Sequence, residues 1–308
     1  MKAAVLSAPG IPDYASFEAP VAREGESLVT VTAAGLNPID VLLASGRIGP
    51  PMLPSVPGRE GVGTVDGRRV YFSASRAPFG SMAEMSLAAT GALMPLLDDI
   101  DDGTALALGI AGLTGWLALS ESARLVAGET VLVLGASGAV GVVALQAARL
   151  LGAGRVVAAA RSAEGQARAL ELGADAVVDL SSEDNLAGRI REACAGRLDV
   201  VVDPLWGPPA KAALSCLTAG GRLIQIGNSA GAELVLNPAF MRFPRSAILG
   251  FSGGSVAHGP RAAAFARMQD HVLAGELATT FTAMPLSDVA SAFELQMRSP
   301  GSKLVLVP

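Results

Sequence analysis

The residues best suited to chemistry form a glycine-rich loop, Gly135–Gly141, between the apolar run Thr130–Leu134 and the helical pattern Val140–Leu151. Its glycines are spaced G-x-x-G-x-x-G rather than G-x-G-x-x-G. Small residues at a strand-to-helix turn let the backbone approach a pyrophosphate, and the helix N-terminus offers N–H donors and a positive dipole end. The loop therefore predicts a dinucleotide site, with tight packing of the turn as the alternative.

The residues that follow the next strand indicate which dinucleotide is bound. An NAD site usually has Asp or Glu about 20 residues after the loop, where it binds the ribose hydroxyls. This strand ends at Ala160 and is followed by Arg161 and Ser162, a cation and a hydroxyl donor. An arginine fork matches the oxygens of a 2′-phosphate, so the sequence favours NADPH, unless Arg161 is only a solvated loop charge.

Several other chemistries are excluded by counting. The only tyrosines are Tyr14 and Tyr71, so no Tyr-x-x-x-Lys proton donor exists. The only histidines are His258 and His271, and the two cysteines form neither a C-x-x-C pair nor a disulfide framework, so no tetrahedral zinc set can be assembled. A net charge of -5 and 4% aromatic residues argue against nucleic acid as a partner.

The middle of the chain alternates between apolar strands and helices. Runs such as VLVL, VVAAA and DVVVD do not alternate in polarity, which is typical of parallel strands covered by helices on both faces. Repeated strand–helix units predict a doubly wound α/β domain. After the first strand and helix, the expected elements are strands Arg155–Ala160, Ala176–Asp179, Asp199–Asp203 and Arg222–Ile226, and helices Glu164–Leu172, Leu186–Ala195, Pro209–Leu217 and Ala262–Leu277.

The first hundred residues are instead rich in short β-like runs. Lys2–Leu6 and Leu28–Ala34 are bounded by Gly and Pro, and an Asp66-Gly67 turn predicts a hairpin between Gly61–Val65 and Arg69–Phe72. Residues 46–58 form a loop rich in Pro and Gly, and the acidic stretch 98–103 could start a helix. The tail from Phe281 returns to short β-like pieces, so we expect one discontinuous domain that holds an inserted one.

The chain resembles the medium-chain dehydrogenase/reductase superfamily over nearly its whole length, specifically the zinc-free quinone oxidoreductase branch. The resemblance rests on several motifs in order: AAGLNPID (33–40), PGREGVG (57–63), GSMAE (80–84), LTGW (113–116), AGETVLVLGASGAVG (127–141), GGRLIQIG (220–227) and GSKLVL (301–306).

This resemblance implies a GroES-like catalytic domain at residues 1–107 and 252–308 and a Rossmann domain at 108–251, with NADPH as the cofactor. The branch also implies a homodimer. By position, Asn37 is the implied catalytic residue. The implied cofactor-binding residues are Thr114, Ser137, Gly138, Ala139, Val140, Arg161, Ser162, Ile226, Gly227, Asn228, Phe251, Ser252, Gly253 and Lys303.

The zinc-containing members of this superfamily differ from the chain at two positions. They have Cys near the position of Asn37 and a His-Glu pair where this chain has Arg59-Glu60, so no metal is expected. Two departures from the branch concern the substrate pocket. The loop Ser45–Pro51 lacks the Tyr that quinone reductases often have, and the segment Gly67–Gly80 is short.

The expected activity is reduction of a small-molecule quinone or α,β-unsaturated carbonyl by NADPH without zinc, with Asn37 near the developing oxyanion or the nicotinamide ribose. Two alternatives remain: an acyl-thioester enoyl reductase, and a non-catalytic NADPH-binding structural or sensor protein. The N-terminus lacks a signal-peptide pattern, and no run of about 18 apolar residues is free of charges and breakers. A cytoplasmic protein without a membrane span is therefore expected.

Overall fold

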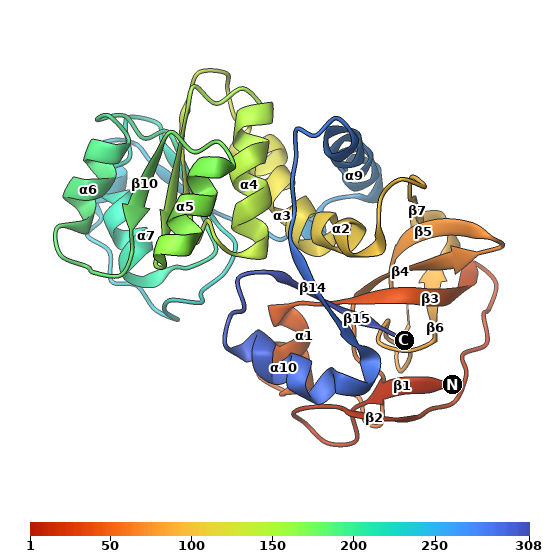
Figure 1. Cartoon of the computed structure of the whole chain (residues 1–308). Helices are drawn as coiled ribbons and strands as arrows, with labels where there is room; N and C mark the ends of the chain where they lie inside the picture. Colours follow the sequence, from red (N-terminus) through yellow and green to blue (C-terminus); the bar gives the residue numbers. More distant parts are fainter. Residues whose placement is uncertain (75) are drawn as a thin grey trace. The chain divides into compact units, whose positions relative to one another are not determined.

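The computed structural model describes residues 1–74 and 76–308, which form two compact units (Figure 1). We call residues 1–111 and 258–308 the discontinuous unit and residues 112–257 the central unit. The expected boundaries were 107 and 251, a few residues earlier in each case. The second boundary lies later because the turn η4 (Gly253–Ser255) packs against Thr114, so residues just after 251 stay with the central unit.

The central unit contains, within its described residues, a six-stranded sheet of order β10-β9-β8-β11-β12-β13 in which all neighbours are parallel. Residues 131–134 are fully buried, because helices cover both faces. The strand order reverses between β8 and β11, the usual place for a ligand in such sheets. The strands are β8 (Thr130–Leu134), β9 (Arg155–Ala160), β10 (Ala176–Asp179), β11 (Val200–Asp203), β12 (Arg222–Gln225) and β13 (Ala247–Gly250).

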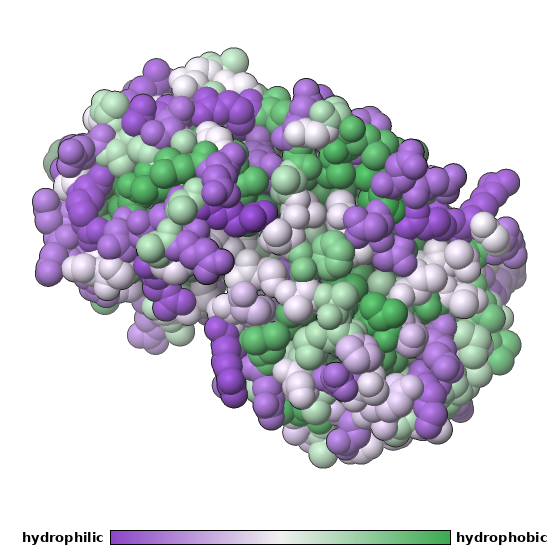
Figure 2. Space-filling model, viewed as in Figure 1, coloured by the Kyte–Doolittle hydropathy of each residue, from purple (hydrophilic) through white to green (hydrophobic). Residues whose placement is uncertain are grey.

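The helices of the central unit follow the predicted alternation, which confirms the doubly wound α/β class. Figure 2 shows hydrophilic residues interspersed with hydrophobic ones over α5 and α6, in keeping with helices that bury only one side. β13 was not predicted. The helical elements are α3 (Leu113–Leu117), η3 (Ala118–Ala123), α4 (Ala139–Leu150), α5 (Ala163–Glu171), α6 (Leu186–Ala193), α7 (Gly207–Leu214) and α8 (Ala239–Arg242).

The discontinuous unit is built on a sheet that has seven strands in the part of the chain described here: β14-β15-β3-β4-β5-β7, with β6 also paired to β3. β4 and β5 form the predicted hairpin, and Asp66 and Gly67 have φ of 50° and 76°. β1 and β2 form a separate pair. The strands are β1 (Lys2–Val5), β2 (Asp13–Ser16), β3 (Glu26–Leu36), β4 (Glu60–Val65), β5 (Arg68–Ser73), β6 (Met85–Ala89), β7 (Met94–Pro95), β14 (Phe281–Pro285) and β15 (Lys303–Val307).

The pairing of β15 with β3 joins the two ends of the chain in one sheet: Leu304 lies opposite Leu36, and Leu306 lies opposite Ala34. This pairing brings Lys303, the first residue of β15, beside the end of β3, where Asn37 begins the next helix. The N-terminal and C-terminal segments of the chain therefore share one sheet, as expected for a single discontinuous domain.

In this unit the bounds of one predicted helix were wrong, and another helix was not predicted. The helix expected at Ala262–Leu277 is α9 (His258–Leu273), which starts earlier because Pro260 is tolerated in a first turn, and ends before Gly275 at φ 72°. The tail is not only β-like, since α10 (Val289–Met297) lies between β14 and β15. The other helical elements are α1 (Pro38–Ala44), η1 (Thr90–Ala92), α2 (Asp102–Leu106), η2 (Ala107–Gly112) and η5 (Leu286–Asp288).

One helical stretch, Asp102–Ala123, is long and apolar enough to cross a membrane by length and composition alone. The stretch contains Gly109, Gly112 and Gly115, so it does not contradict the expectation that no apolar run of about 18 residues is free of charges and breakers. Most of it, 78% of its most apolar window, is buried inside the protein, as in the core helix of a globular domain.

Candidate cofactor and substrate sites

The glycine loop of the central unit connects β8 to α4. Gly138 is the N-cap of α4 and offers no side-chain cap, so no side chain covers the first amides of this helix. Gly135 has φ 63°, and a Cβ on Gly141 would lie 2.3 Å from the carbonyl oxygen of Gly135. Ser137, Gly138, Ala139 and Val140 thus surround an accessible helix N-terminus, which fits the pyrophosphate of a dinucleotide.

Arg161 and Ser162 follow β9 at the same edge of the sheet. Ser162 is the N-cap of α5, and its Oγ accepts a hydrogen bond from the Gly165 amide at 3.1 Å, which leaves the hydroxyl proton free to be donated. A Cβ on Gly165 would lie 2.7 Å from the Cβ of Ser137, so the first turn of α5 adjoins the glycine loop. Arg161 is exposed. This arrangement fits a phosphate on the adenosine ribose.

The remaining predicted residues of the central unit follow β12 and β13. The amides of Ile226 and Phe251 donate to the carbonyls of Asp203 and Gln225 at 2.8 and 2.9 Å, which fixes both segments beside the neighbouring strand ends. A Cβ on Gly253 would lie 3.1 Å from Thr114 Oγ1. Gly227, Asn228 and Ser252 lie within these segments. The structure therefore gathers these residues near the carboxyl ends of the strands, as their order predicted.

Asp203, at the end of β11, is a buried carboxyl that sequence reasoning did not single out. Its Oδ1 accepts from the Leu205 and Trp206 amides at 2.9 Å each, whereas its Oδ2 has no partner among the described residues. Burial raises the pKa of Asp203 to about 6, although these two amides act to lower it. The carboxyl thus stabilises the turn after β11, while the backbone carbonyl of Asp203 accepts from the Ile226 amide that follows β12.

The discontinuous unit contains a buried polar group that we call the Glu60 cluster: Asn37, Asp40, Glu60, Tyr71 and Lys303, each at most 4% exposed. Glu60 Oε1 is bonded to the Lys303 ammonium and accepts from Asn37 Nδ2 at 2.9 Å. Glu60 Oε2 accepts from the Tyr71 hydroxyl at 2.6 Å and from the Ile110 amide at 2.7 Å. Four donors therefore satisfy one buried carboxylate.

The amide of Asn37 is fully engaged in this cluster. Its Oδ1 accepts from Lys303 Nζ at 2.6 Å, and its Nδ2 donates to Glu60 at 2.9 Å and to Asp40 Oδ2 at 3.3 Å. Asp40 Oδ2 also accepts from the Asn37 backbone amide at 2.9 Å, which completes a capping box at the start of α1. Donation from Asn37 to a substrate oxygen, the predicted role, would require one of these bonds to break.

Burial and charge act in opposite directions on the carboxyls of this cluster. Burial acts to raise the pKa of Glu60, but the Lys303 charge and the hydrogen bonds outweigh it, so the pKa is lowered and Glu60 is ionised. Burial raises the pKa of Asp40 to about 6, with Lys303 opposing and the Glu60 charge reinforcing the shift. Burial and the Glu60 charge raise the pKa of Tyr71, which stays a neutral donor.

Lys303 was predicted as a cation on the cofactor side, but in this structure its ammonium is engaged by Glu60 and Asn37. Sequence reasoning missed the roles of Asp40, Glu60 and Tyr71. Two signals were available: a glutamate opening the buried strand EGVGTV, and a lysine opening the apolar strand KLVLV. A buried charge needs a counter-charge, so each of these residues indicated that a group of opposite charge lies close to it in the fold.

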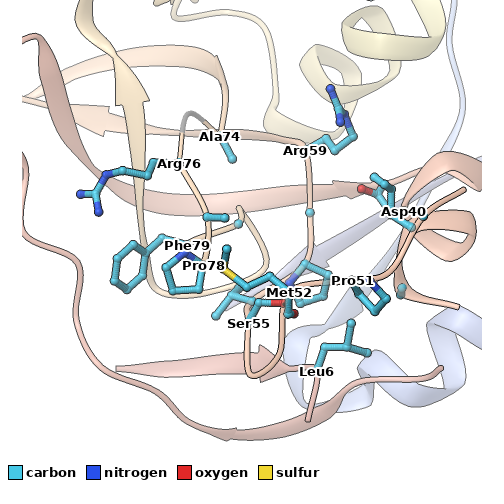
Figure 3. A pocket seen from close by; sticks show the side chains of 18 of the residues that line it. Leu6, Asp40, Pro51, Met52, Ser55, Arg59, Ala74, Arg76, Pro78 and Phe79 are labelled. Carbon is cyan, nitrogen blue, oxygen red and sulfur yellow. The ribbon is translucent and has the colours of Figure 1, made fainter. Parts of the chain in front are cut away.

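A cavity of about 360 Å³ lies in the discontinuous unit against α1 and the loop 46–58 (Figure 3). Polar and apolar groups share its lining, with Leu43, Ile48 and Met52 among the apolar residues and Asp40 and Arg59 among the charged ones. No tyrosine is among the lining residues described, as the loop sequence predicted. The short segment 67–80 includes Ser75, which lies outside the described residues.

No group of three or more His, Cys, Asp or Glu residues that could hold a metal ion exists within residues 1–74 and 76–308. The groups that could hold a cofactor are therefore the backbone amides, Ser162 and Arg161 of the central unit, and the cavity of the discontinuous unit offers space for a small organic molecule. A Rossmann unit inserted in a GroES-like unit defines the medium-chain dehydrogenase/reductase class.

Comparison with known proteins agrees with this class. The family described as "Alcohol dehydrogenase GroES-like domain" matches residues 23–96, and the family described as "Zinc-binding dehydrogenase" matches residues 139–269. Human quinone oxidoreductase is 31% identical over 75% of this chain and 72% of its own length. Quinone oxidoreductase of Pseudomonas aeruginosa is 32% identical over 74% of this chain and 73% of its own.

A solved structure gives the same result. Quinone oxidoreductase of Thermus thermophilus, whose structure was also determined in complex with NADPH, is 32% identical and superposes with a TM-score of 0.86 over 100% of both chains. The chain therefore belongs to the quinone oxidoreductase family of the medium-chain dehydrogenase/reductase superfamily. It is an oxidoreductase.

Proposed function

We propose that this chain is an NADPH-dependent reductase of quinones or α,β-unsaturated carbonyls that works without zinc. The observation that supports it best is the end of β9, where exposed Arg161 and the N-cap Ser162 stand in place of an acid, beside the glycine loop. NADPH, when bound, supplies hydride to an electron-poor carbon of the substrate, whose oxygen takes up the negative charge and then a proton from water.

The residues of the chain bind the cofactor and orient it. The amides at the start of α4 hold the pyrophosphate, and Arg161 with the Ser162 hydroxyl holds the 2′-phosphate. The segments 226–228 and 251–253, together with Thr114, line the nicotinamide end. Oxidation of a simple alcohol would need a Lewis acid or a base for the hydroxyl proton, and the chain offers neither a Tyr-x-x-x-Lys pair nor a His/Cys metal set.

Titration of the protein with NADPH and NADH, followed by NADPH oxidation with a panel of quinones and enones, tests this proposal. Arg161→Gln should weaken NADPH about 10–150-fold, because a hydrogen bond to a charged group contributes about 1.5–3 kcal/mol, and leave NADH affinity nearly unchanged. Equal affinity of the unaltered protein for both cofactors would overturn the role of Arg161. Cofactor binding without turnover on any acceptor would favour the non-catalytic alternative, and turnover restricted to acyl thioesters would favour an enoyl reductase.

Zinc independence has its own test. Steady-state rates should be unchanged after dialysis against a strong chelator, and elemental analysis should find less than one zinc per chain. Stoichiometric, tightly held zinc would contradict this part of the proposal.

We also propose a homodimer formed through β13. Nothing among the described residues pairs with the outer edge of this strand, where Leu249 is 37% exposed, and the preceding segment exposes Val235 and Phe243. A second copy could extend the sheet there. Leu249→Lys should shift the sedimentation coefficient toward a monomer, and Leu170→Lys, on exposed α5, should not.

The proposed location is the cytoplasm. Cys194 and Cys216 are buried and free rather than bridged, which suits a reducing compartment. Fractionation of cells that express the tagged chain would test this, and recovery in a membrane fraction would contradict it.

A further inference from the structure

The cavity of the discontinuous unit combines a few charged or hydroxyl side chains with apolar ones such as Leu43, Ile48 and Met52. Among the lining residues described, the charged or hydroxyl side chains are Asp40, Ser55, Arg59 and Arg76. Figure 3 shows Asp40 and Arg59 at one end of the cavity and Arg76 and Phe79 at the other. A ligand that enters this space meets these groups.

Two of the three possible side-chain donors are already occupied. The Ser55 hydroxyl donates to the Met52 carbonyl at 2.7 Å. Arg76 donates to both oxygens of Glu26, through Nε at 2.9 Å and Nη2 at 3.1 Å. Arg59 is exposed, and no hydrogen bond or ion pair within residues 1–74 and 76–308 holds its guanidinium. Arg59 is therefore the free cation of the cavity among these residues.

The Glu60 cluster cannot take the place of Arg59 as the group that binds a ligand anion without losing hydrogen bonds of its own. Both N–H groups of the Asn37 amide donate to carboxylates, and the Lys303 ammonium is held by Glu60 and Asn37. A group that must bind new negative charge during a reaction has to be available before the charge appears. Asn37 and Lys303 do not meet this condition in this structure, and Arg59 does.

We propose that Arg59 binds the substrate oxygen on which negative charge develops, and that Asn37 positions the Glu60 cluster instead of donating to the substrate. This inference rests on the proposed reduction of a quinone or enone. When bound, NADPH would supply hydride, which is one proton with two electrons, to a carbon conjugated with the carbonyl. The C=C π pair would then form the bond toward the carbonyl carbon, and the carbonyl π pair would move to oxygen. That oxygen would take a proton from water while the Arg59 guanidinium stays protonated throughout.

The position of Arg59 suits this role. It comes directly before Glu60 at the start of β4, so the cluster fixes its backbone while its long side chain stays free. In Figure 3 the guanidinium of Arg59 points away from Met52 and Ser55, so it would have to turn about its side-chain bonds to meet a ligand held beside them.

Two measurements test the assignment, one of them without the cofactor. The first uses 4-nitrophenol, whose phenolate form mimics a hydroquinone anion and absorbs visible light. The bound phenol should ionise at lower pH in the unaltered protein than in Arg59→Gln, by at least tenfold in the phenolate-to-phenol ratio. Arg59→Lys should retain part of the effect. Arg68→Gln, which removes the same charge from an exposed site outside the cavity, should behave as the unaltered protein does.

The second measurement is turnover with a neutral quinone and a neutral enone. Arg59→Gln should lower kcat by about 100-fold or more with little change in NADPH affinity, and Arg59→Lys should recover part of it. Unchanged kcat together with an unchanged phenolate ratio would overturn the inference, as would failure of 4-nitrophenol to bind the unaltered protein. A change only in KM for carboxylated substrates would also overturn it, because Arg59 would then anchor a substrate charge. If the unaltered protein reduces no acceptor, the proposed function fails, whereas the phenolate ratio still tests Arg59.

Discussion

The two candidate sites of this protein are made from different parts of the polypeptide. At the carboxyl edge of the central sheet, the polar groups are mostly backbone amides that neighbouring glycines leave accessible, and the charged side chain Arg161 is exposed. In the Glu60 cluster the polar groups are side chains, all of them buried and bonded to one another.

This difference predicts which kind of substitution should damage each site. A site made of backbone depends on the size of a few residues, so it is damaged by adding atoms. A site made of buried charges depends on pairing, so it is damaged by removing one partner. The three predictions below test this contrast.

The largest effect should come from breaking the buried ion pair. Lys303→Met leaves the Glu60 carboxylate buried without its cation, and we expect the free energy of unfolding of the discontinuous unit to fall by about 3–5 kcal/mol. Trp116 and Trp206 lie in the central unit, so tryptophan fluorescence would not report unfolding of the discontinuous unit. Hydrogen exchange of the β3 and β15 amides is therefore the suitable measurement. The matched control is Lys211→Met, an exposed lysine on α7, which should stay within about 0.5 kcal/mol.

A double variant sharpens the same point. Lys303→Met combined with Glu60→Gln removes both charges and should recover much of the loss, because no unpaired ion remains. If the double variant is as unstable as the sum of its parts, the pair acts through packing and the electrostatic explanation is wrong.

The next effect is a dependence on pH. The folded state holds the Asp40 proton more tightly than the unfolded chain does, because its pKa is raised from 3.8 to about 6. As the pH rises from about 3 to about 7, the unfolded chain releases this proton first, so the free energy of unfolding should fall by about 3 kcal/mol from this residue. Asp203 acts in the same direction.

Asp40→Asn isolates this contribution, since the amide oxygen can still accept the Asn37 backbone N–H. Denaturation of the unaltered protein and the variant at several pH values should show that the variant loses less stability over this interval. Parallel curves would mean that Asp40 ionises at its ordinary pKa.

The smallest effect belongs to the glycine loop. Gly141→Ala places a Cβ 2.3 Å from the Gly135 carbonyl oxygen and 2.7 Å from Ala136 Cα, both backbone atoms that yield little. We expect a loss of about 1–3 kcal/mol from overpacking and weaker NADPH binding. Gly138→Ala is the control for stability, because its nearest atom would be 3.4 Å away and its φ of −82° suits alanine. Tryptophan fluorescence during denaturation measures the stability of both variants, and an equal loss of stability in Gly141→Ala and Gly138→Ala would refute the steric explanation.

The contrast also explains how much the sequence predicted. The glycine loop, Arg161 and Ser162 were found because each follows a strand within a few residues, and a parallel sheet brings strand ends to one edge. Glu60 and Lys303 are 243 residues apart, and no local pattern links them. Their pairing depends on the register of β15 against β3, which only the folded sheet defines.

The elements that were not predicted from the sequence can be explained by their local sequence. β13 is apolar and as long as β10, β11 and β12, but the segment before it contains only the four-residue helix α8, so the strand–helix alternation that marked the other strands is interrupted there. The start of α9 contains Gly259 and Pro260, which are typical of turns, and the packing of Phe265 and Met268 outweighs that preference. α10 follows a proline-containing strand and was taken for β structure, although Val289, Ala292 and Phe293 have the spacing of one helix face.

The pairing of β15 with β3 also sets an order during biosynthesis. A ribosome adds about 5–20 residues per second, so Glu60 leaves the peptidyl-transferase centre about 12–50 s before Lys303 does. All of residues 112–257 are made in that interval, and they need no later strand to complete their sheet. The nascent chain therefore contains every strand of the central sheet while residues 34–36 of β3 still lack β15 and Glu60 has no cation, and the discontinuous unit can close only after β15 has been made.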